Sequence, residues 1–265
     1  MMIEYLIILA IIQGITEFIP VSSSAHLILF PNLISFDDQG LVIDVAVHFG
    51  SLLAVCIYLW REILFMFTGS TFINTYSFDR YKLFILILIG SFPIIFFGYF
   101  INIYNFNWIR SIETIAWCTL IFGLLLYLSD NFFLRVKKLK DINLKSSLII
   151  GIIQILAFLP GTSRSGIVIT IARILGFDRP TALRFSLLLS IPAILGATAL
   201  KSFEIYTLGD YQLGQEFIFS SLISFIFSFM SIVLMMRWLK FSSFTPFVIY
   251  RFFLGTILLL AVYIW

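Results

Sequence analysis

The feature of this sequence that most constrains its fold is a series of apolar runs, each about as long as a bilayer is thick. A helix needs roughly 20 consecutive, mainly apolar residues to cross the hydrocarbon core. Only 12% of the residues are charged, against about 25% in soluble domains, so no soluble domain is left over. We expect about six transmembrane helices in a single membrane domain, residues 1–265. The six runs are residues 42–60, 83–101, 112–128, 181–200, 217–238 and 247–265.

Two further apolar regions, residues 3–31 and 146–175, are interrupted by polar residues at 17–26 and 160–165. Each region therefore predicts two short helices joined by a polar loop, which is the pattern of a re-entrant helix hairpin. Irregular backbone at membrane depth is tolerated only where protein or water satisfies its amides. The sequence thus predicts an all-α polytopic membrane protein with an internal polar cavity.

The two halves of the chain are related in sequence. EFIPVSSS at residues 17–24 aligns with AFLPGTSR at 157–164, and AVHFGSLL at 46–53 aligns with ALRFSLLL at 182–189. Each half holds one hairpin and three spans, so the second half should be inverted relative to the first. We predict an inverted-topology repeat whose broken helices meet near the bilayer midplane. Repeat one covers about residues 1–130 and repeat two about 148–265, with a basic loop at about 131–147.

Basic residues indicate the orientation of the chain. The loop at 131–147 should be cytoplasmic under the positive-inside rule, which places both termini on the extracytoplasmic side. The net charge of +3 is modest, and we expect no nucleic-acid partner. The basic residues of the loop are Arg135, Lys137, Lys138, Lys140 and Lys145.

Ionisable side chains at membrane depth are costly, so they are functional candidates by default. Gln13 and Glu17 are four residues apart and share a helix face. Their oxygens could hold a hard divalent cation together with substrate phosphate, or they could form a hydrogen-bonded pair that satisfies the broken helix.

Ser22, Ser23 and Ser24 follow Pro20 at a predicted helix start, where hydroxyls cap free amides and the helix end attracts anions. His26 lies three residues after Ser23, so its imidazole can reach that hydroxyl as a base, or attack phosphorus itself. A structural role for the histidine is the alternative.

The second break predicts a cradle for phosphate oxygens, built on a flexible glycine, hydroxyls and one guanidinium. A salt bridge from Arg164 to Glu17 across the cavity is the alternative role of that arginine. Thr170 adds a further hydroxyl or bonds back to its own helix. His48 and Arg184 occupy equivalent positions in the two halves and either line the cavity or lie at the interface. The residues of the cradle are Gly161, Thr162, Ser163, Arg164 and Ser165.

The motifs Q-x-x-x-E at 13–17, P-V-S-S-S-A-H at 20–26 and P-G-T-S-R-S-G at 160–166 resemble those of the bacterial undecaprenyl pyrophosphate phosphatases of the bacitracin-resistance type. The resemblance covers essentially the whole chain. It implies hydrolysis of undecaprenyl diphosphate to undecaprenyl phosphate and inorganic phosphate, which recycles the lipid carrier of cell-wall synthesis. It also implies a divalent cation (Mg²⁺ or Ca²⁺), the bacterial cytoplasmic membrane and a site open to the extracytoplasmic side, and it is compatible with a homodimer.

Carried over by position, Gln13 and Glu17 match the acidic motif of that family, and Ser23 and His26 match its proposed nucleophile and base. Ser163, Arg164 and Thr170 match its phosphate-binding motif. The first position of the acidic motif is Gln13 here, which leaves one carboxylate for a metal. We rank Ser23 first as the nucleophile, an activated water second and His26 third.

A lipid-phosphate transporter or flippase is the main rival hypothesis, because secondary transporters also place broken helices at the midplane. Transport of an anion needs an arginine and helix ends, but neither a nucleophile nor a base. The combination of Ser, His, Glu and Arg therefore favours an enzyme, and a structural subunit would not need these polar groups at all.

Overall fold

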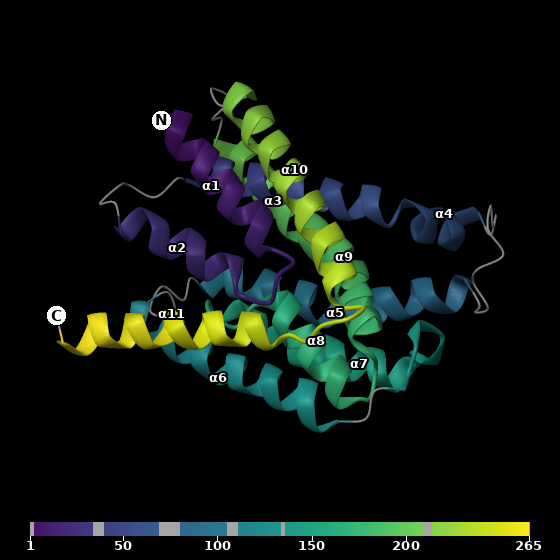
Figure 1. Cartoon of the computed structure of the whole chain (residues 1–265). Helices are drawn as coiled ribbons and strands as arrows, with labels where there is room; N and C mark the ends of the chain where they lie inside the picture. The colour runs from purple at the N-terminus through teal and green to yellow at the C-terminus, as the bar shows by residue number, and fades with distance from the viewer. Residues whose placement is uncertain are drawn as a thin grey trace.

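The computed structural model describes residues 3–33, 40–68, 80–104, 111–133, 136–208 and 214–264. Arg135 of the basic loop lies outside these ranges. Within them nearly all of the chain is helical, and the only β-type pairing is an isolated bridge between Lys137 and Phe177 (Figure 1). The all-α class predicted from the apolar runs is confirmed.

Five helices are each long and apolar enough to cross a membrane, and α3 with α4 makes a sixth candidate span that bends by 72°. The described helices therefore match the six predicted spans. Their bounds are α3 Leu41–Tyr58, α4 Trp60–Thr68, α5 Arg80–Tyr104, α6 Ile112–Phe132, α9 Arg179–Leu208, α10 Gly214–Trp238 and α11 Thr245–Ile264.

Two pairs of short helices occupy the interrupted regions. The first pair is α1 (Ile3–Thr16) and α2 (Ser23–Leu33), and the second is α7 (Leu144–Ile153) and α8 (Arg164–Ile174). The members of each pair pack on one another, and a 3₁₀ segment, Gln154–Phe158, continues α7 toward the second break. The interruptions predicted from sequence are thus real breaks in the helices.

Helix packing follows one pattern in both halves of the molecule. Helices α1 and α3 pack against α10, whereas α7 and α9 pack against α5. Helix α3 packs on α9, and α6 lies beside α11 along the lower edge of the view (Figure 1). Since α5 and α10 are the second spans of their halves, exchanging the halves reproduces each of these contacts, as a two-fold related pair of repeats would require. The repeat boundaries and the inverted orientation stay predictions.

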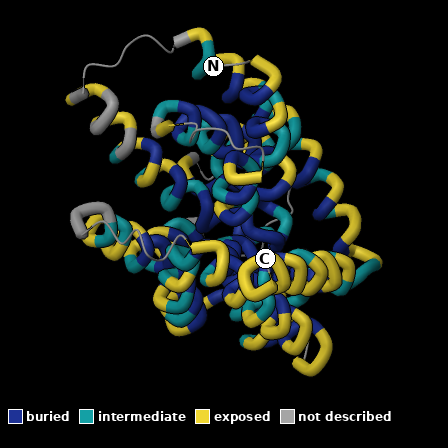
Figure 2. Tube along the Cα trace, turned by 90° about the vertical axis from the view of Figure 1, so that its left-hand side faces the viewer, coloured by how far each residue is buried: buried dark blue, intermediate teal, exposed yellow. Residues whose placement is uncertain are grey.

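Small residues bring α3 and α10 into close contact. A Cβ atom built on Gly50 would lie 2.1 Å from the carbonyl oxygen of Ser221. Ser221 donates to the carbonyl of Ala46 at 2.8 Å, and Ser224 donates to that of Val47 at 2.6 Å. Small side chains and interhelical hydrogen bonds hold helices together where lipid offers no hydrophobic drive. Many large apolar side chains are exposed instead, and Figure 2 shows that the exposed residues lie on the outer turns of the helices.

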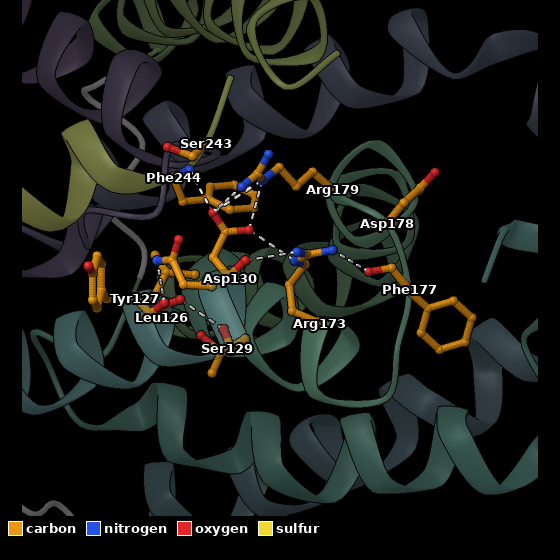
Figure 3. A network of polar contacts seen from close by, with 12 residues as sticks. Leu126, Tyr127, Ser129, Asp130, Arg173, Phe177, Asp178, Arg179, Ser243 and Phe244 are labelled. Carbon is orange, nitrogen blue, oxygen red and sulfur yellow. Dashed lines mark hydrogen bonds and ion pairs between the residues drawn. The ribbon is translucent and has the colours of Figure 1, made fainter. Parts of the chain in front are cut away.

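A buried ion cluster ties together the ends of four helices. Asp130 at the end of α6 is 1% exposed and lies between two arginines (Figure 3). Its Oδ1 accepts from Arg173 Nε at 3.0 Å and from Arg179 Nε at 2.8 Å, and its Oδ2 accepts from the Phe244 amide at 3.2 Å. These partners belong to α8, the start of α9 and the turn before α11, so one carboxylate fixes how those elements meet.

The basic loop is tied to the same end of the molecule by Lys138, which forms an ion pair with Asp178. Partial burial alone would raise the pKa of the Asp178 carboxyl, but hydrogen bonds from Lys138 and Thr181 outweigh it and hold the pKa below its ordinary value.

Candidate active site

A cavity of about 870 Å³ lies between the two breaks and the helices α2, α3, α5 and α9. Polar and apolar residues line different parts of this cavity. The breaks, the helix starts that follow them, and α3 supply the polar groups, whereas α5 and α9 supply mostly apolar side chains. The polar lining residues are Glu17, Ser22, Ser23, Ser24, Asp44, His48, Ser163 and Arg164. The apolar lining includes Phe92, Ile95, Phe96, Tyr99, Ile194 and Leu200.

Glu17 is the point at which the two halves meet. Its side chain is buried, and its Oε2 accepts from Ser23 Oγ at 2.7 Å and from Gln13 Nε2 at 3.0 Å. Its Oε1 accepts from Arg164 Nη2 at 3.1 Å. The predicted alternative of a salt bridge between Arg164 and Glu17 is therefore formed in this structure, and one carboxylate gathers an amide, a hydroxyl and a guanidinium.

The local backbone explains why Ser23 and Arg164 converge on this carboxylate. Ser22 and Ser163 are the non-glycine residues with positive φ in the described part of the chain, at 74° and 70°. Each directly precedes a short helix, and Ser163 Oγ caps α8 by accepting from the Gly166 amide at 3.1 Å. Ser23 and Arg164 are thus the first residues of their helices. Strained backbone of this kind clusters at functional sites.

These helix starts correct the register of the repeat by one residue. The sequence alignment pairs Ser24 with Arg164, but by helix position Ser23 corresponds to Arg164. Hydroxyl pairs confirm the correspondence, because Ser22 with Ser24 and Ser163 with Ser165 each lie 3.2 Å apart. The second break is longer by one residue after its proline.

The structure does not bring His26 to Ser23. His26 Nδ1 lies 2.7 Å from the carbonyl oxygen of Ser22, and Nε2 lies 2.6 Å from the hydroxyl of Tyr250, whose ring stacks on the imidazole. His26 is also absent from the described cavity lining. The expectation that its imidazole contacts the Ser23 hydroxyl is wrong for this arrangement, in which Glu17 is the hydrogen-bond partner of Ser23.

Part of the predicted phosphate cradle lies behind the cavity. Thr170 donates to the carbonyl of Gly166 at 2.8 Å, the back-bonded alternative, and Thr162 is fully buried. Gly161, with φ +96°, donates to Ser22 Oγ at 3.1 Å, and Ser165 donates to the carbonyl of Ile19 at 3.3 Å. Gly161 and Ser165 thus join the two breaks. Of the five residues of the predicted cradle, Ser163 and Arg164 are those that line the cavity.

The sequence left open whether His48 and Arg184 line the cavity. In the structure the two residues have different environments. His48 lines the cavity and fixes its ring through Nδ1, 2.7 Å from the carbonyl oxygen of Asp44. Arg184 is outside the described lining and pairs with Glu62 at 2.7 Å near the bend between α3 and α4. The imidazole that faces the cavity is therefore that of His48.

The Gln13 and Glu17 pair forms the hydrogen-bonded arrangement that sequence offered as the alternative to a metal site. Among the described residues, no group of three or more His, Cys, Asp or Glu side chains could hold a metal by itself. Gln13 Oε1 is buried and has no hydrogen-bond partner within the described ranges.

Sequence reasoning missed two residues of α11 that contact the breaks from behind. Tyr250 holds His26, and Arg251 reaches carbonyl groups of both breaks. Arg251 interrupts an otherwise apolar run at 247–265, and an ionisable residue in such a run was the signal that could have found it.

The fold and the cavity together define a class, that of polytopic membrane proteins with a polar cavity between two broken helices. The family model described as bacitracin resistance protein BacA matches residues 6–257, and the chain belongs to that family. Similar proteins named undecaprenyl-diphosphatase come from Jannaschia sp. (strain CCS1), 44% identical over 97% of this chain and 98% of the relative, and from Roseobacter denitrificans, 41% identical over 99% and 100%. A third, from Ruegeria pomeroyi, is 41% identical over 98% of each chain.

Proposed function

We propose that this membrane protein hydrolyses undecaprenyl diphosphate to undecaprenyl phosphate and inorganic phosphate. This reaction recycles the lipid carrier of peptidoglycan synthesis and is associated with bacitracin resistance. The relatives carry the name of this activity over their full length. The observation that carries the chemistry is the convergence of Ser23 and Arg164 on Glu17 inside the cavity.

The divided lining suits a lipid diphosphate. Arg164 and Ser163, at the start of α8, offer a guanidinium fork, a hydroxyl and a helix N-terminus to phosphate oxygens. The apolar side chains of α5 and α9 offer a wall along which the first isoprene units can lie. Those two helices also have exposed apolar faces, so a long prenyl tail can leave the cavity toward lipid.

The hydrogen bond from Ser23 to Glu17 supports Glu17 as the base for that hydroxyl. Ser23 Oγ attacks the terminal phosphorus as its proton moves to Glu17, the bridging P–O bond breaks, and undecaprenyl phosphate leaves with the bond electrons. Water then attacks the phosphoserine and the P–Oγ bond breaks. Glu17 returns its proton to Ser23 Oγ, and the protons of the water leave with the inorganic phosphate. If water attacks directly instead, Glu17 takes the proton of that water.

Arg164 changes partner in this scheme. In the structure its guanidinium is paired with Glu17 at 3.1 Å. When the diphosphate arrives, its oxygens compete for the guanidinium, and a bidentate arginine–phosphate pair forms readily. Glu17 then loses its cation partner and keeps its hydrogen bond from Ser23 while the substrate is in place.

A divalent cation, Mg²⁺ or Ca²⁺, fits this site only if substrate oxygens complete its coordination. Glu17 and Gln13 would hold it, and the buried Gln13 Oε1 is an oxygen ligand without another described partner. Mg²⁺ is commonly bound by one or two carboxylates plus substrate phosphates, which matches one carboxylate and one amide. When bound, such an ion would neutralise charge on the phosphates.

Phosphate release from undecaprenyl diphosphate by the purified protein in detergent tests the activity, measured with added Mg²⁺ or Ca²⁺ and with a chelator. The proposal expects release that Glu17→Gln reduces strongly. No release by the wild-type protein under any metal condition would overturn it. In that case transfer of labelled lipid phosphate between leaflets of vesicles would test the transport alternative.

The proposal places the protein in the bacterial inner membrane, with the termini and the cavity opening on the extracytoplasmic side. It rests on the positive residues of the 131–147 loop. Single cysteines replacing Ser24 and Lys140 test it with an impermeant thiol reagent on intact spheroplasts. Labelling at position 24 without labelling at 140 is expected, and the reverse pattern would invert the orientation.

A further inference from the structure

Arg251 of α11 is fully buried and contacts three separate segments of the chain. From the first break it binds the carbonyl of Pro20 at 3.2 Å, and from the second it binds those of Gly161 at 2.8 Å and Thr162 at 3.1 Å. Two more of its hydrogen bonds reach α6, at the carbonyls of Cys118 and Thr119. One planar side chain therefore joins both breaks to the span behind them.

Its partners in the breaks are carbonyl groups that have no helical hydrogen-bond partner. The carbonyls of Pro20, Gly161 and Thr162 lie between helices and cannot join a helical ladder, and a buried carbonyl without a partner is costly. Guanidinium carries five N–H donors in a fixed fork, which lets it serve several carbonyls at once. Within the described ranges Arg251 has no carboxylate partner, so carbonyl dipoles alone solvate its charge.

Two glycines make the space that Arg251 occupies. A Cβ built on Gly123 of α6 would lie 3.3 Å from both Cβ and Nε of Arg251, and one on Gly166 of α8 would lie 3.2 Å from its Nη1. These are tighter than ordinary contacts, so the guanidinium is held on two sides by helix backbone. The position of Arg251 is therefore set by the fold around it.

The hydrogen bonds of Arg251 lie close to the residues that meet at the carboxylate. Pro20 is three residues before Ser23, and Thr162 is two residues before Arg164. Direct bonds between the breaks, from Gly161 to Ser22 and from Ser165 to Ile19, are 3.1 and 3.3 Å long and neutral. Besides the Arg164–Glu17 ion pair, Arg251 adds charge-assisted bonds to the backbone of both breaks, and such bonds are about twice as strong as neutral ones.

We infer that Arg251 is a positioning residue that clamps the two breaks in register, so that Ser23 and Arg164 reach Glu17 together. It touches no cavity surface and acts through the backbone of both breaks. Its charge, facing the breaks from behind without a counter-ion, also favours an anionic substrate in front of them. This inference rests on the proposed phosphatase activity but concerns a residue that the motifs do not contain.

Arg251→Lys is the discriminating variant, because lysine keeps the positive charge but lacks the planar guanidinium that donates hydrogen bonds to both breaks at once. A displacement of about 1 Å between reacting groups costs on the order of 10²-fold in rate. We therefore expect kcat to fall about 10²-fold with KM changed by less than about threefold. Arg173→Lys is the matched control, since Arg173 is equally buried and bonds Asp130 and Phe177 at the other end of α8. It should lower the melting temperature but leave kcat near wild type below that temperature.

A double-mutant cycle with Glu17→Gln adds a readout that a general loss of stability would not give. If Arg251 acts by placing groups around Glu17, Arg251→Lys should lose little further rate in that background. Additive losses in the cycle would overturn the inference. A wild-type kcat in Arg251→Lys would also overturn it. The same holds if the rates of Arg251→Lys and Arg173→Lys fall in proportion to their melting temperatures.

Hydrogen exchange followed by mass spectrometry tests the clamp without any substrate. Arg251→Lys should speed exchange in peptides that cover residues 155–166 and 17–24, whereas Arg173→Lys should leave them protected. If wild-type protein fails to release phosphate but these peptides respond as expected, the proposed function fails and the clamp stands. Unchanged protection in Arg251→Lys would remove the clamp whatever the activity.

Discussion

Ser23→Ala separates the two routes that the active-site geometry allows. In the structure the Ser23 hydroxyl makes one charge-assisted hydrogen bond, 2.7 Å long, to Glu17. If water is the nucleophile, the variant loses only that bond, which is worth about 1.5–3 kcal/mol and corresponds to roughly 10- to 150-fold in rate. If Ser23 is the nucleophile, removing it abolishes the covalent route, and we expect kcat to fall by more than about 10⁴-fold, as when a nucleophile is removed from other enzymes.

The assay is phosphate release from undecaprenyl diphosphate under saturating substrate, with acid quenching to trap phosphoserine. Ser24→Ala is the matched control, because Ser24 also lines the cavity but bonds only Ser22 among the described contacts. We expect Ser24→Ala to lose less than about tenfold in rate, the effect of a neutral hydrogen bond. Retention of more than about one hundredth of the wild-type kcat in Ser23→Ala, with no trapped phosphoserine in the wild type, would refute Ser23 as nucleophile.

Three further expectations concern the scaffold. Gly50→Ala places a Cβ about 2.1 Å from the Ser221 carbonyl oxygen, so α3 and α10 must separate. The melting temperature should therefore fall by several degrees. Gly196→Ala, whose new Cβ would have its nearest contact at 3.6 Å, should leave the melting temperature nearly unchanged. Asp130→Asn removes the charge between two arginines and should destabilise the fold by about 3–5 kcal/mol in denaturant titration, with normal kcat in the protein that stays folded. Because the folded pKa of Asp178 is lowered, its contribution to stability is present above its unfolded pKa of about 4 and is lost as pH falls through the lower folded value. The melting temperature of Asp178→Asn should therefore match wild type only at the acidic end of a pH series.

The spans and breaks could be predicted from sequence because a bilayer imposes one length and one polarity on every crossing segment. The six apolar runs correspond to helices, and the two polar interruptions correspond to breaks, at nearly the expected residues. The position of each helix start within its break was less accessible. It depends on Ser22 and Ser163 adopting positive φ, a conformation that serine seldom takes and that no local pattern signals.

The role of His26 was predicted from spacing along a single helix. Residues three apart share a face, but Ser23 is the first helical residue and its side chain turns to Glu17, while the imidazole turns back to the carbonyl of Ser22. Its second partner, Tyr250, is 224 residues away in the chain. Contacts of that range follow from how the halves pack, and a sequence pattern within one half cannot contain them.

The pairing of Glu17 with Arg164 also explains how a polar cavity persists in an apolar fold. A lone carboxylate or guanidinium at this depth would be costly, but the two half-repeats each contribute one sign of charge and neutralise one another at 3.1 Å. Behind the breaks, Arg251 is satisfied by carbonyls and adds a further positive charge. An incoming diphosphate therefore finds one guanidinium, that of Arg164, at the cavity surface and a second, that of Arg251, behind the breaks. It can displace Glu17 from Arg164 without leaving Arg164 unpaired, and the displaced carboxylate is already hydrogen-bonded to Ser23, the proposed nucleophile.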